Sequence, residues 1–217
     1  MQRERFEGVS GFSVALRDGE MVEFRPVKRD DWQTIKNGMS DLSAKSRYFR
    51  FFSPIAQLSD AQLQYFTEID QQDHVAWIAL ARDRVEHPGV AIARFIRFQN
   101  QADTAEFAVA VIDSYQKRGL GTMLMAVLYL RARARGIKIL RGFVLSENTV
   151  AMRWFERLGA VGKFESGVYQ MDIAVLDDSS SSPLLQCLAD DLAQRCSQAS
   201  AIDIDSLETK IGVVGRV

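Results

Sequence analysis

The sequence predicts a mixed α/β fold in which an antiparallel β meander precedes a β-α-β-α-β segment. Three observations lead to this prediction. Alternating apolar stretches meet at a turn pair early in the chain, and longer apolar stretches suited to buried strands follow. Two stretches with helical spacing then separate the last three predicted strands. Strands joined by one helix favour parallel pairing, whereas hairpins require antiparallel pairing.

The N-terminal half is predicted to hold two hairpins with helices between them. Asp18-Gly19 is typical of a hairpin turn, and Ser59 is suited to cap a helix. The predicted elements, in chain order, are a hairpin over 12–27, a helix over 28–42, an aromatic segment over 43–52, a helix over 60–69 and a hairpin over 75–98.

The next part of the chain alternates strands and helices. Gly136 and Gly159 each follow a predicted helix, where glycine is favoured as the C-terminal cap. The predicted elements are a strand over 104–112, a helix over 120–135, a strand over 139–145, a helix over 148–158 and a strand over 168–175.

The C-terminal residues are predicted to form an appendage. We expect a body over 1–176, a linker over 177–183 and a helical appendage over 184–217. Apolar residues from Leu185 to Cys196 follow helical spacing, and a second such stretch runs from Ile204 to Val214. Packing of this appendage on the body is favoured over the alternative, a homodimer or partner contact.

Composition excludes several classes of protein. The 217 residues are 47% hydrophobic and 25% charged, which is typical of a globular chain and not of a disordered one. Lys and Arg number 27 against 28 Asp and Glu, so the charge balance favours neither nucleic acid nor a membrane surface as partner. No apolar run approaches a membrane span, and the first twelve residues lack the apolar core of a secretory signal. We therefore expect a cytoplasmic protein.

Metal and disulfide chemistry is not expected. The two cysteines, Cys187 and Cys196, lie about a hundred residues from His74 and His87 and share no metal-ligand spacing with them. We predict no metal site.

The loop over 116–121 predicts an anion site. A strand enters a bend with Gly119 and Gly121 that opens a helix, and glycine allows a ligand to approach the main chain closely. The first N–H groups of a helix lack intrahelical partners and favour a phosphate. A dinucleotide fingerprint does not fit, because Leu124 stands where its third glycine is required. A P-loop does not fit either, because the residue directly before Thr122 is a glycine and not the required lysine.

The strand before this loop carries one carboxylate. Period-two alternation places Phe107, Val109 and Val111 on one face, and Glu106 with two alanines on the other. A carboxylate in an apolar strand is costly unless it is paired, solvated or functional. The sequence leaves two interpretations of Glu106 open, a functional group or an ion pair with a nearby arginine such as Arg94 or Arg97.

Two motifs resemble the GNAT N-acetyltransferases. Gln116-Lys-Arg-Gly-Leu-Gly121 matches the acyl-CoA signature of that family, and residues 148–159 resemble its following helix. The resemblance extends from about Val22 to Val175. A narrower likeness, carried by residues 46–52, Leu58-Ser59 and Ala105-Glu-Phe-Ala, is to the acetyltransferase domain of bacterial Pat-type protein lysine acetyltransferases.

The resemblance implies a GNAT fold, acetyl-CoA as co-substrate and an amine acceptor, with a protein lysine favoured. It also implies a general-base role for Glu106, which would take a proton from the acceptor ammonium. The residues that it places at acyl-CoA are Val109, Ala110 and Val111 along the pantetheine arm, Gln116, Lys117, Arg118, Gly119, Leu120, Gly121 and Thr122 at the diphosphate, and Asn148 and Phe155 from the following helix.

The sequence departs from the family at Phe155. Many members have a tyrosine there, thought to protonate the leaving thiolate, so no general acid is assigned. Neither cysteine lies in the motifs, which disfavours an acyl-cysteine intermediate. The alternatives that stay open are acetylation of a small-molecule amine, such as a polyamine, an amino acid or an antibiotic, and a non-catalytic acyl-CoA sensor or scaffold.

Overall fold

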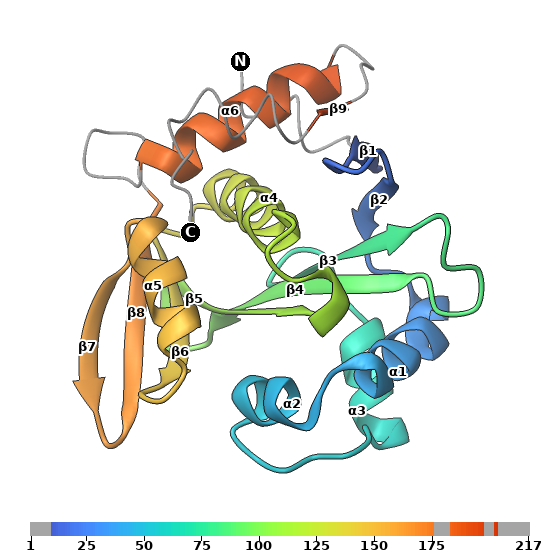
Figure 1. Ribbon diagram of the computed structural model, residues 1–217. Helices are drawn as coiled ribbons and strands as arrows, with labels where there is room; N and C mark the ends of the chain where they lie inside the picture. Colours follow the sequence, from blue (N-terminus) through green and yellow to red (C-terminus); the bar gives the residue numbers. More distant parts are fainter. Residues whose placement is uncertain (1–9, 176–182, 198–201, 204–217) are drawn as a thin grey trace.

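A single sheet organises the molecule, and helices cover both of its faces (Figure 1). The computed structural model describes residues 10–175, 183–197 and 202–203. In these residues the strand order is β7-β8-β6-β5-β4-β3-β2-β1-β9. The strands are β1 (Phe12–Ala15), β2 (Met21–Pro26), β3 (His74–Ala81), β4 (Gly89–Phe98), β5 (Gln101–Val111), β6 (Ile139–Leu145), β7 (Val161–Glu165), β8 (Val168–Ala174) and β9 (Ile202–Asp203).

The helices form two layers. The described α-helices are α1 (Trp32–Asp41), α2 (Ala44–Phe51), α3 (Asp60–Thr67), α4 (Leu120–Ala134), α5 (Thr149–Arg157) and α6 (Pro183–Ser197). Figure 1 shows α1, α2 and α3 on one side of the sheet and α4 with α6 on the other. Helix α4 packs on β3, β4 and β5, and α1 packs on β4. Short 3₁₀ turns at Arg29–Asp31 and Asp113–Tyr115 precede α1 and α4.

Helix α4 is apolar around its whole circumference because it is buried on two sides. It lies between the sheet and α6, and every residue from Met123 to Ala132 is buried. A helix that is hydrophobic all round is expected in such a position. Arg131 places its guanidinium 5.1 Å from the Trp77 ring, so even this charged side chain lies against the core.

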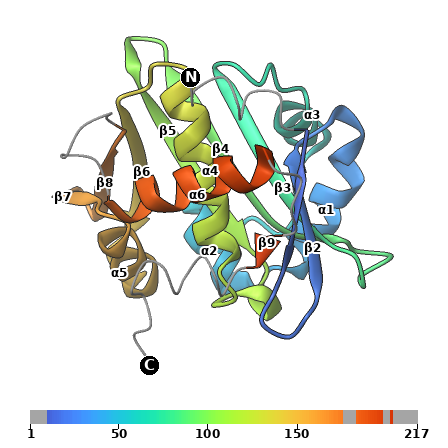
Figure 2. The ribbon, with the colours of Figure 1, turned by 90° about the horizontal axis from the view of Figure 1, so that it is seen from above.

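The described part of the appendage packs on the body, which confirms the favoured prediction for α6. Leu185, Leu188 and Leu192 are buried, and α6 crosses α4 when seen from above (Figure 2). Strand β9 pairs in parallel with β1. The second helical stretch, over 204–214, lies outside the described residues, and the division of the chain at 177–183 stays a prediction.

Most predicted elements are confirmed, and three features differ. The aromatic segment over 43–52 is a helix, α2, capped by Ser43. Strand β7 is absent from the sequence prediction; it pairs antiparallel with β8. Strand β8 lies antiparallel to β6, because this extra strand reverses the chain after α5. The expected parallel pairing is confirmed for β5 and β6.

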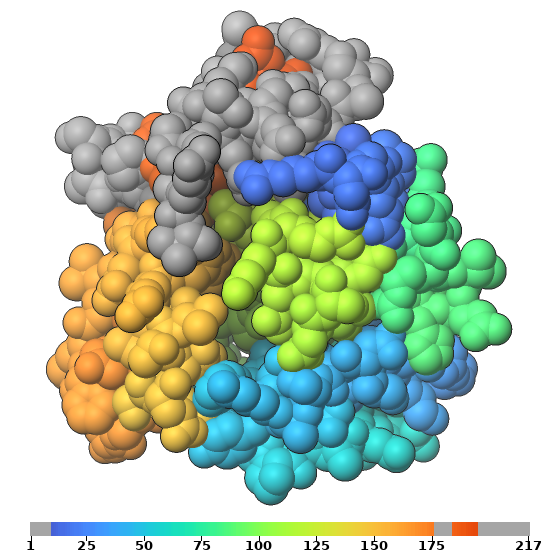
Figure 3. Space-filling view, viewed as in Figure 1, coloured from blue at the N-terminus to red at the C-terminus, as the bar shows by residue number. Residues whose placement is uncertain are grey.

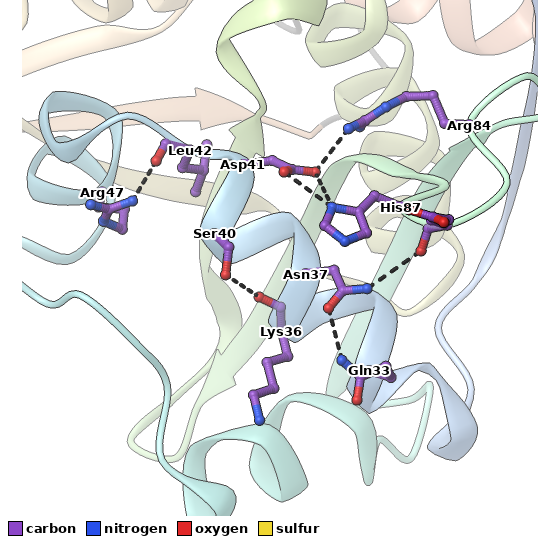
Figure 4. A network of polar contacts seen from close by, with 10 residues as sticks. Gln33, Lys36, Asn37, Ser40, Asp41, Leu42, Arg47, Arg84 and His87 are labelled. Atoms are coloured by element: carbon purple, nitrogen blue, oxygen red, sulfur yellow. Dashed lines mark hydrogen bonds and ion pairs between the residues drawn. The ribbon is translucent and has the colours of Figure 1, made fainter.

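Helix α1 is fixed to the turn between β3 and β4 by a polar network (Figure 4). Asp41 accepts from Arg84 at 2.9 Å and contacts His87 Nδ1 at 3.2 Å. Asn37 donates to the main-chain oxygen of Glu86. Arg47 at the start of α2 donates to the main-chain oxygen of Leu42. These contacts hold α1 and α2 beside β4 and β5, where the candidate site lies.

Candidate active site

Strands β5 and β6 separate half-way along β5. Their parallel pairing covers Thr104, Ala105 and Glu106 and ends there, opposite Arg141. The Phe107 ring then takes the space beside Gly142, where a Cβ would lie only 2.8 Å from it. An aromatic side chain of β5 therefore fills the point at which the strands part.

Beyond Glu106, the edge of β5 that faces this gap has no strand partner among the described residues, and the Val111 carbonyl on it accepts from the Gln116 side chain. The N–H of Ile112 donates to the carbonyl of Val90, which assigns the even-numbered residues of this stretch to pairing with β4. Phe107, Val109 and Val111 therefore turn their main-chain N–H and C=O groups toward the gap. An extended ligand that carries amides can pair with such an edge as an added strand.

Ala110 differs from its neighbours in orientation. Its peptide groups belong to the even-numbered set that pairs with β4, and its methyl group lines a cavity on the α1 side of the sheet. Of the three strand residues predicted at the pantetheine arm, Val109 and Val111 thus present their main chain to the gap and Ala110 does not.

The loop after β5 ends at the N-terminus of α4. Gly119 has φ of 85°, a left-handed conformation that favours glycine. No side chain caps this helix, so the N–H groups at its start point out from the end of β5. Figure 3 shows the surface hollowed between the yellow-green residues of α4 and the golden residues of α5. The structure thus presents main-chain groups, without a capping side chain, at the place where the sequence predicts an anion site.

The loop is fixed from α5. Trp154 donates through Nε1 to the Thr122 hydroxyl at 3.1 Å, and its ring lies 3.4 Å from the position of a Cβ on Gly121. Trp154 packs against the core and at the same time supports the start of α4. Leu120 is buried, and Gln116 and Lys117 are exposed.

The Arg118 side chain is paired with carboxylates of the β1–β2 hairpin. Its guanidinium pairs with Glu20 at 2.8 Å and with Asp18, and it lies 4.5 Å from the Tyr115 ring. The Tyr115 hydroxyl also donates to Glu20. The positive charge expected from Arg118 at the loop is thus neutralised by the β1–β2 hairpin, and Lys117 keeps an exposed ammonium.

Glu106 is exposed on the opposite face of β5 from Phe107. Among the described residues it forms no ion pair with Arg94 or Arg97. Arg97 pairs with Asp73 at 2.7 Å, and Arg94 lies against His74 and Phe66. Neither of the two arginines named from the sequence therefore pairs with Glu106, whose charge acts instead on Arg50 of α2 and raises the pKa of that guanidinium against the effect of burial.

The two residues predicted from α5 have local structural contacts. Asn148 caps α5, since its Oδ1 accepts from the N–H of Ala151 at 3.2 Å. Phe155 is buried and packs edge-on against Phe107, with ring centroids 5.2 Å apart. Phe155 therefore lies at the parting of β5 and β6, where it offers no proton.

Sequence reasoning missed Asp113, which links the loop after β5 to the start of α2. Its carboxylate accepts from the N–H and hydroxyl of Ser43 and from the hydroxyl of Ser46, each within 2.9 Å. Burial alone would raise the pKa of Asp113, but these hydrogen bonds outweigh burial and hold the pKa below its usual value. Gln116 reaches both the Ser46 hydroxyl and the Val111 carbonyl. The start of α2 is thus tied to the glycine loop.

The arrangement matches a known family. Residues 39–160 match the model of the acetyltransferase (GNAT) family. The chain belongs to the GNAT acetyltransferase family. Among solved structures, the GNAT domain of PAT from S. lividans superimposes on this GNAT chain with a TM-score of 0.69 and 31% sequence identity, covering 76% of this chain and 96% of that one.

Two curated proteins are also similar to this GNAT chain. Acetyltransferase Pat of Mycolicibacterium smegmatis is 34% identical over 168 residues, which is 77% of this chain and 50% of that protein. Acetyltransferase PA5475 of Pseudomonas aeruginosa is 31% identical over 149 residues, which is 69% of this chain and 80% of that protein. The chain thus spans only half the length of the Mycolicibacterium relative.

Metal-binding clusters and membrane-spanning helices are both absent from the described ranges. These residues contain no group of three or more His, Cys, Asp or Glu arranged to hold a metal ion. None of the described helices is both long and apolar enough to cross a membrane.

Proposed function

We propose that this protein transfers an acetyl group from acetyl-CoA directly to an amine, with the ε-amine of a protein lysine as the favoured acceptor. The observation that carries the proposal is the free edge of β5, which leads from Glu106 to the uncapped start of α4. Membership of the GNAT family and the likeness to proteins named Pat support it.

In the proposed complex the loop amides over 117–122 bind the diphosphate of acetyl-CoA, because N–H groups at a helix start favour anions. The pantetheine arm then runs along the edge of β5 as an added strand. An N–H group of Val109 or Val111 donates to the thioester oxygen and stabilises its developing negative charge. The direction of β5 brings the thioester toward Glu106.

Glu106 accepts a proton from the acceptor ammonium, directly or through water, so that a neutral amine is formed. The amine nitrogen bonds to the thioester carbon, the carbon–sulfur bond breaks, and CoA leaves as a thiolate. The nitrogen then releases its extra proton to solvent, which leaves a neutral amide. Phe155 cannot protonate that thiolate. A thiol of ordinary pKa near 8.5 is an adequate leaving group without a general acid.

A labelling experiment tests the acceptor class. The protein is incubated with ¹³C-acetyl-CoA and a cell lysate, which is then divided by ultrafiltration into protein and small-molecule fractions. We expect enzyme-dependent label on protein lysines, detected by peptide mass spectrometry, because the proposed base is exposed rather than enclosed. A reaction without the enzyme corrects for spontaneous acetylation.

The other outcomes identify the rival functions. Label confined to amines in the small-molecule fraction would overturn the assignment of a protein lysine as acceptor and would still support acetyl transfer to an amine. Binding of acetyl-CoA without label in either fraction would favour a sensor. The cytoplasmic location and a homodimer through the appendage stay predictions.

A further inference from the structure

A cavity lies on the face of the sheet away from α4. Its volume is about 70 Å³, which is room for several water-sized groups. The walls come from α1, α2, α3, β3, β4 and β5 and are mostly apolar, with Ile35, Met39, Phe66 and Ile92 among them. The charged side chains that line it are Arg50 and Arg94. An apolar cavity that holds two guanidinium groups is unusual, because cations are normally kept in water or paired.

Arg94 is almost completely buried, with 5% of its surface exposed. Its Cζ lies 4.1 Å from the Phe66 ring centroid, and Nη1 lies 3.1 Å from His74 Nε2. Burial and then the charge of Arg94 lower the pKa of His74 to about 4, so at neutral pH this imidazole is uncharged and its Nε2 accepts. Among the described residues, this is the one hydrogen bond of the Arg94 guanidinium, which has five N–H donors.

Arg50 brings a second positive charge to the same cavity. It projects from α2, is partly buried, and places Cζ 5.0 Å from the Phe51 ring centroid. Burial and then the charge of Arg50 lower the pKa of Arg94 to about 9. Burial also lowers the pKa of Arg50, and the charge of Glu106 opposes that shift. The cavity thus holds two like charges, and the Glu106 carboxylate lies close enough to Arg50 to act on it.

Several partly buried arginines of this chain are paired with carboxylates. Arg25 pairs with Asp31 and Arg141 with Asp172, each at 2.7 Å. Within the described residues, neither Arg50 nor Arg94 forms an ion pair with a carboxylate. Unpaired buried charge is costly, and proteins retain such costs mainly at functional sites.

We propose that this cavity binds a carboxylate on a short apolar stem, with the carboxylate between Arg50 and Arg94 and the stem against the apolar walls. Guanidinium groups match carboxylate geometry, since two parallel N–H donors meet the two oxygens. The stem would displace water from apolar surface, which favours binding further.

The carboxylate has two sources that fit this chemistry. It belongs either to a separate small ligand or to the acceptor itself. Arg94 lies opposite Ala108 in the β4–β5 pairing, and Glu106 follows two residues away on the same face of the sheet. An acceptor that carries a carboxylate as well as an amine therefore fits both groups. Only this acceptor placement rests on the proposed function.

Calorimetry on the full chain tests the site without any turnover. Hexanoate and its uncharged counterpart, hexanamide, are each titrated into the protein at the same ionic strength, and their affinities are compared. We expect hexanoate to bind about tenfold more tightly or better, and R50M or R94M each to remove about that factor, as is typical of hydrogen bonds to charged groups. R157M, at an exposed arginine of α5, serves as the matched control and is expected to leave hexanoate affinity unchanged.

Thermal unfolding of the same variants separates a binding role from a structural one. Methionine replaces an unpaired charge with an apolar chain of similar length, so the melting temperature of R94M is expected to hold or rise. If R94M does not fold, the hexanoate affinity of R50M, whose substitution lies on α2, is the test of the site. Equal affinities for hexanoate and hexanamide, or unchanged hexanoate affinity in the decisive variant, would overturn the site.

Transfer assays with 6-aminohexanoate and hexylamine distinguish the two sources. A higher kcat/KM for 6-aminohexanoate that R94M abolishes assigns the carboxylate to the acceptor. Equal values, with hexanoate still bound, assign it to a separate ligand and overturn the acceptor placement. Absence of transfer to any amine would count against the proposed function, and the calorimetric result would still decide the site.

Discussion

Replacing Glu106 by glutamine is expected to lower kcat by about 10²–10⁴-fold, the usual effect of losing a general base. Glutamine keeps the size and hydrogen-bonding capacity of the side chain but accepts no proton at neutral pH. Because Glu106 is exposed and lies outside the glycine loop, the affinity for acetyl-CoA is expected to stay unchanged. Steady-state kinetics with a saturating amine and calorimetry with acetyl-CoA measure the two quantities.

Asp103→Asn is the matched control for this result. Asp103 is an exposed carboxylate on the same strand and lies 3.8 Å from Lys138, away from the gap between β5 and β6. Its substitution is expected to leave both kcat and acetyl-CoA affinity as they are. A Glu106→Gln enzyme with wild-type kcat would remove Glu106 from the mechanism.

Gly119→Val is expected to weaken acetyl-CoA binding by about tenfold or more, because the loop must change shape and its hydrogen bonds to the charged diphosphate are lost. Gly119 holds φ at 85°, and a side chain in left-handed conformation costs about 1–2 kcal/mol. A β-branched residue tolerates that region least. Calorimetry gives the affinity, and chemical denaturation gives the free energy of unfolding.

Gly167→Val is the matched control, because it distinguishes the effect of backbone strain on stability from an effect on acetyl-CoA binding. Gly167 has φ of 84° in the turn between β7 and β8, and a Cβ added there would meet no atom within 4 Å. The two valine variants are expected to lose similar stability, and only Gly119→Val is expected to lose acetyl-CoA affinity. Equal affinities in the two variants would contradict the placement of the diphosphate at the start of α4.

Local signals in the sequence are sufficient to predict much of the fold. The Asp18-Gly19 turn, the Ser59 cap and the apolar run of α4 each depend on neighbouring residues, and each prediction is confirmed. The splitting of β5 and β6 has no such local signal. It occurs where Phe107 meets Gly142, two residues that are distant in sequence and adjacent in space.

The missed features have non-local causes. The start of α2 is stabilised by Asp113, which lies 70 residues after Ser43 in the chain. Strand β7 is exposed along its whole length, so it carries no alternating burial pattern, and it is held by pairing with β8. The side chain of Arg118 pairs with the β1–β2 hairpin, a partner that the glycine motif alone does not indicate.

Backbone hydrogen exchange with and without acetyl-CoA tests the central claim most directly, since it follows the amides that the co-substrate is proposed to meet. We expect slower exchange at Val109, at Val111 and over residues 117–122, and little change at the β4-paired amides of Ala108 and Ala110. Protection confined to other segments, with the free edge of β5 and the start of α4 exchanging as before, would contradict the account.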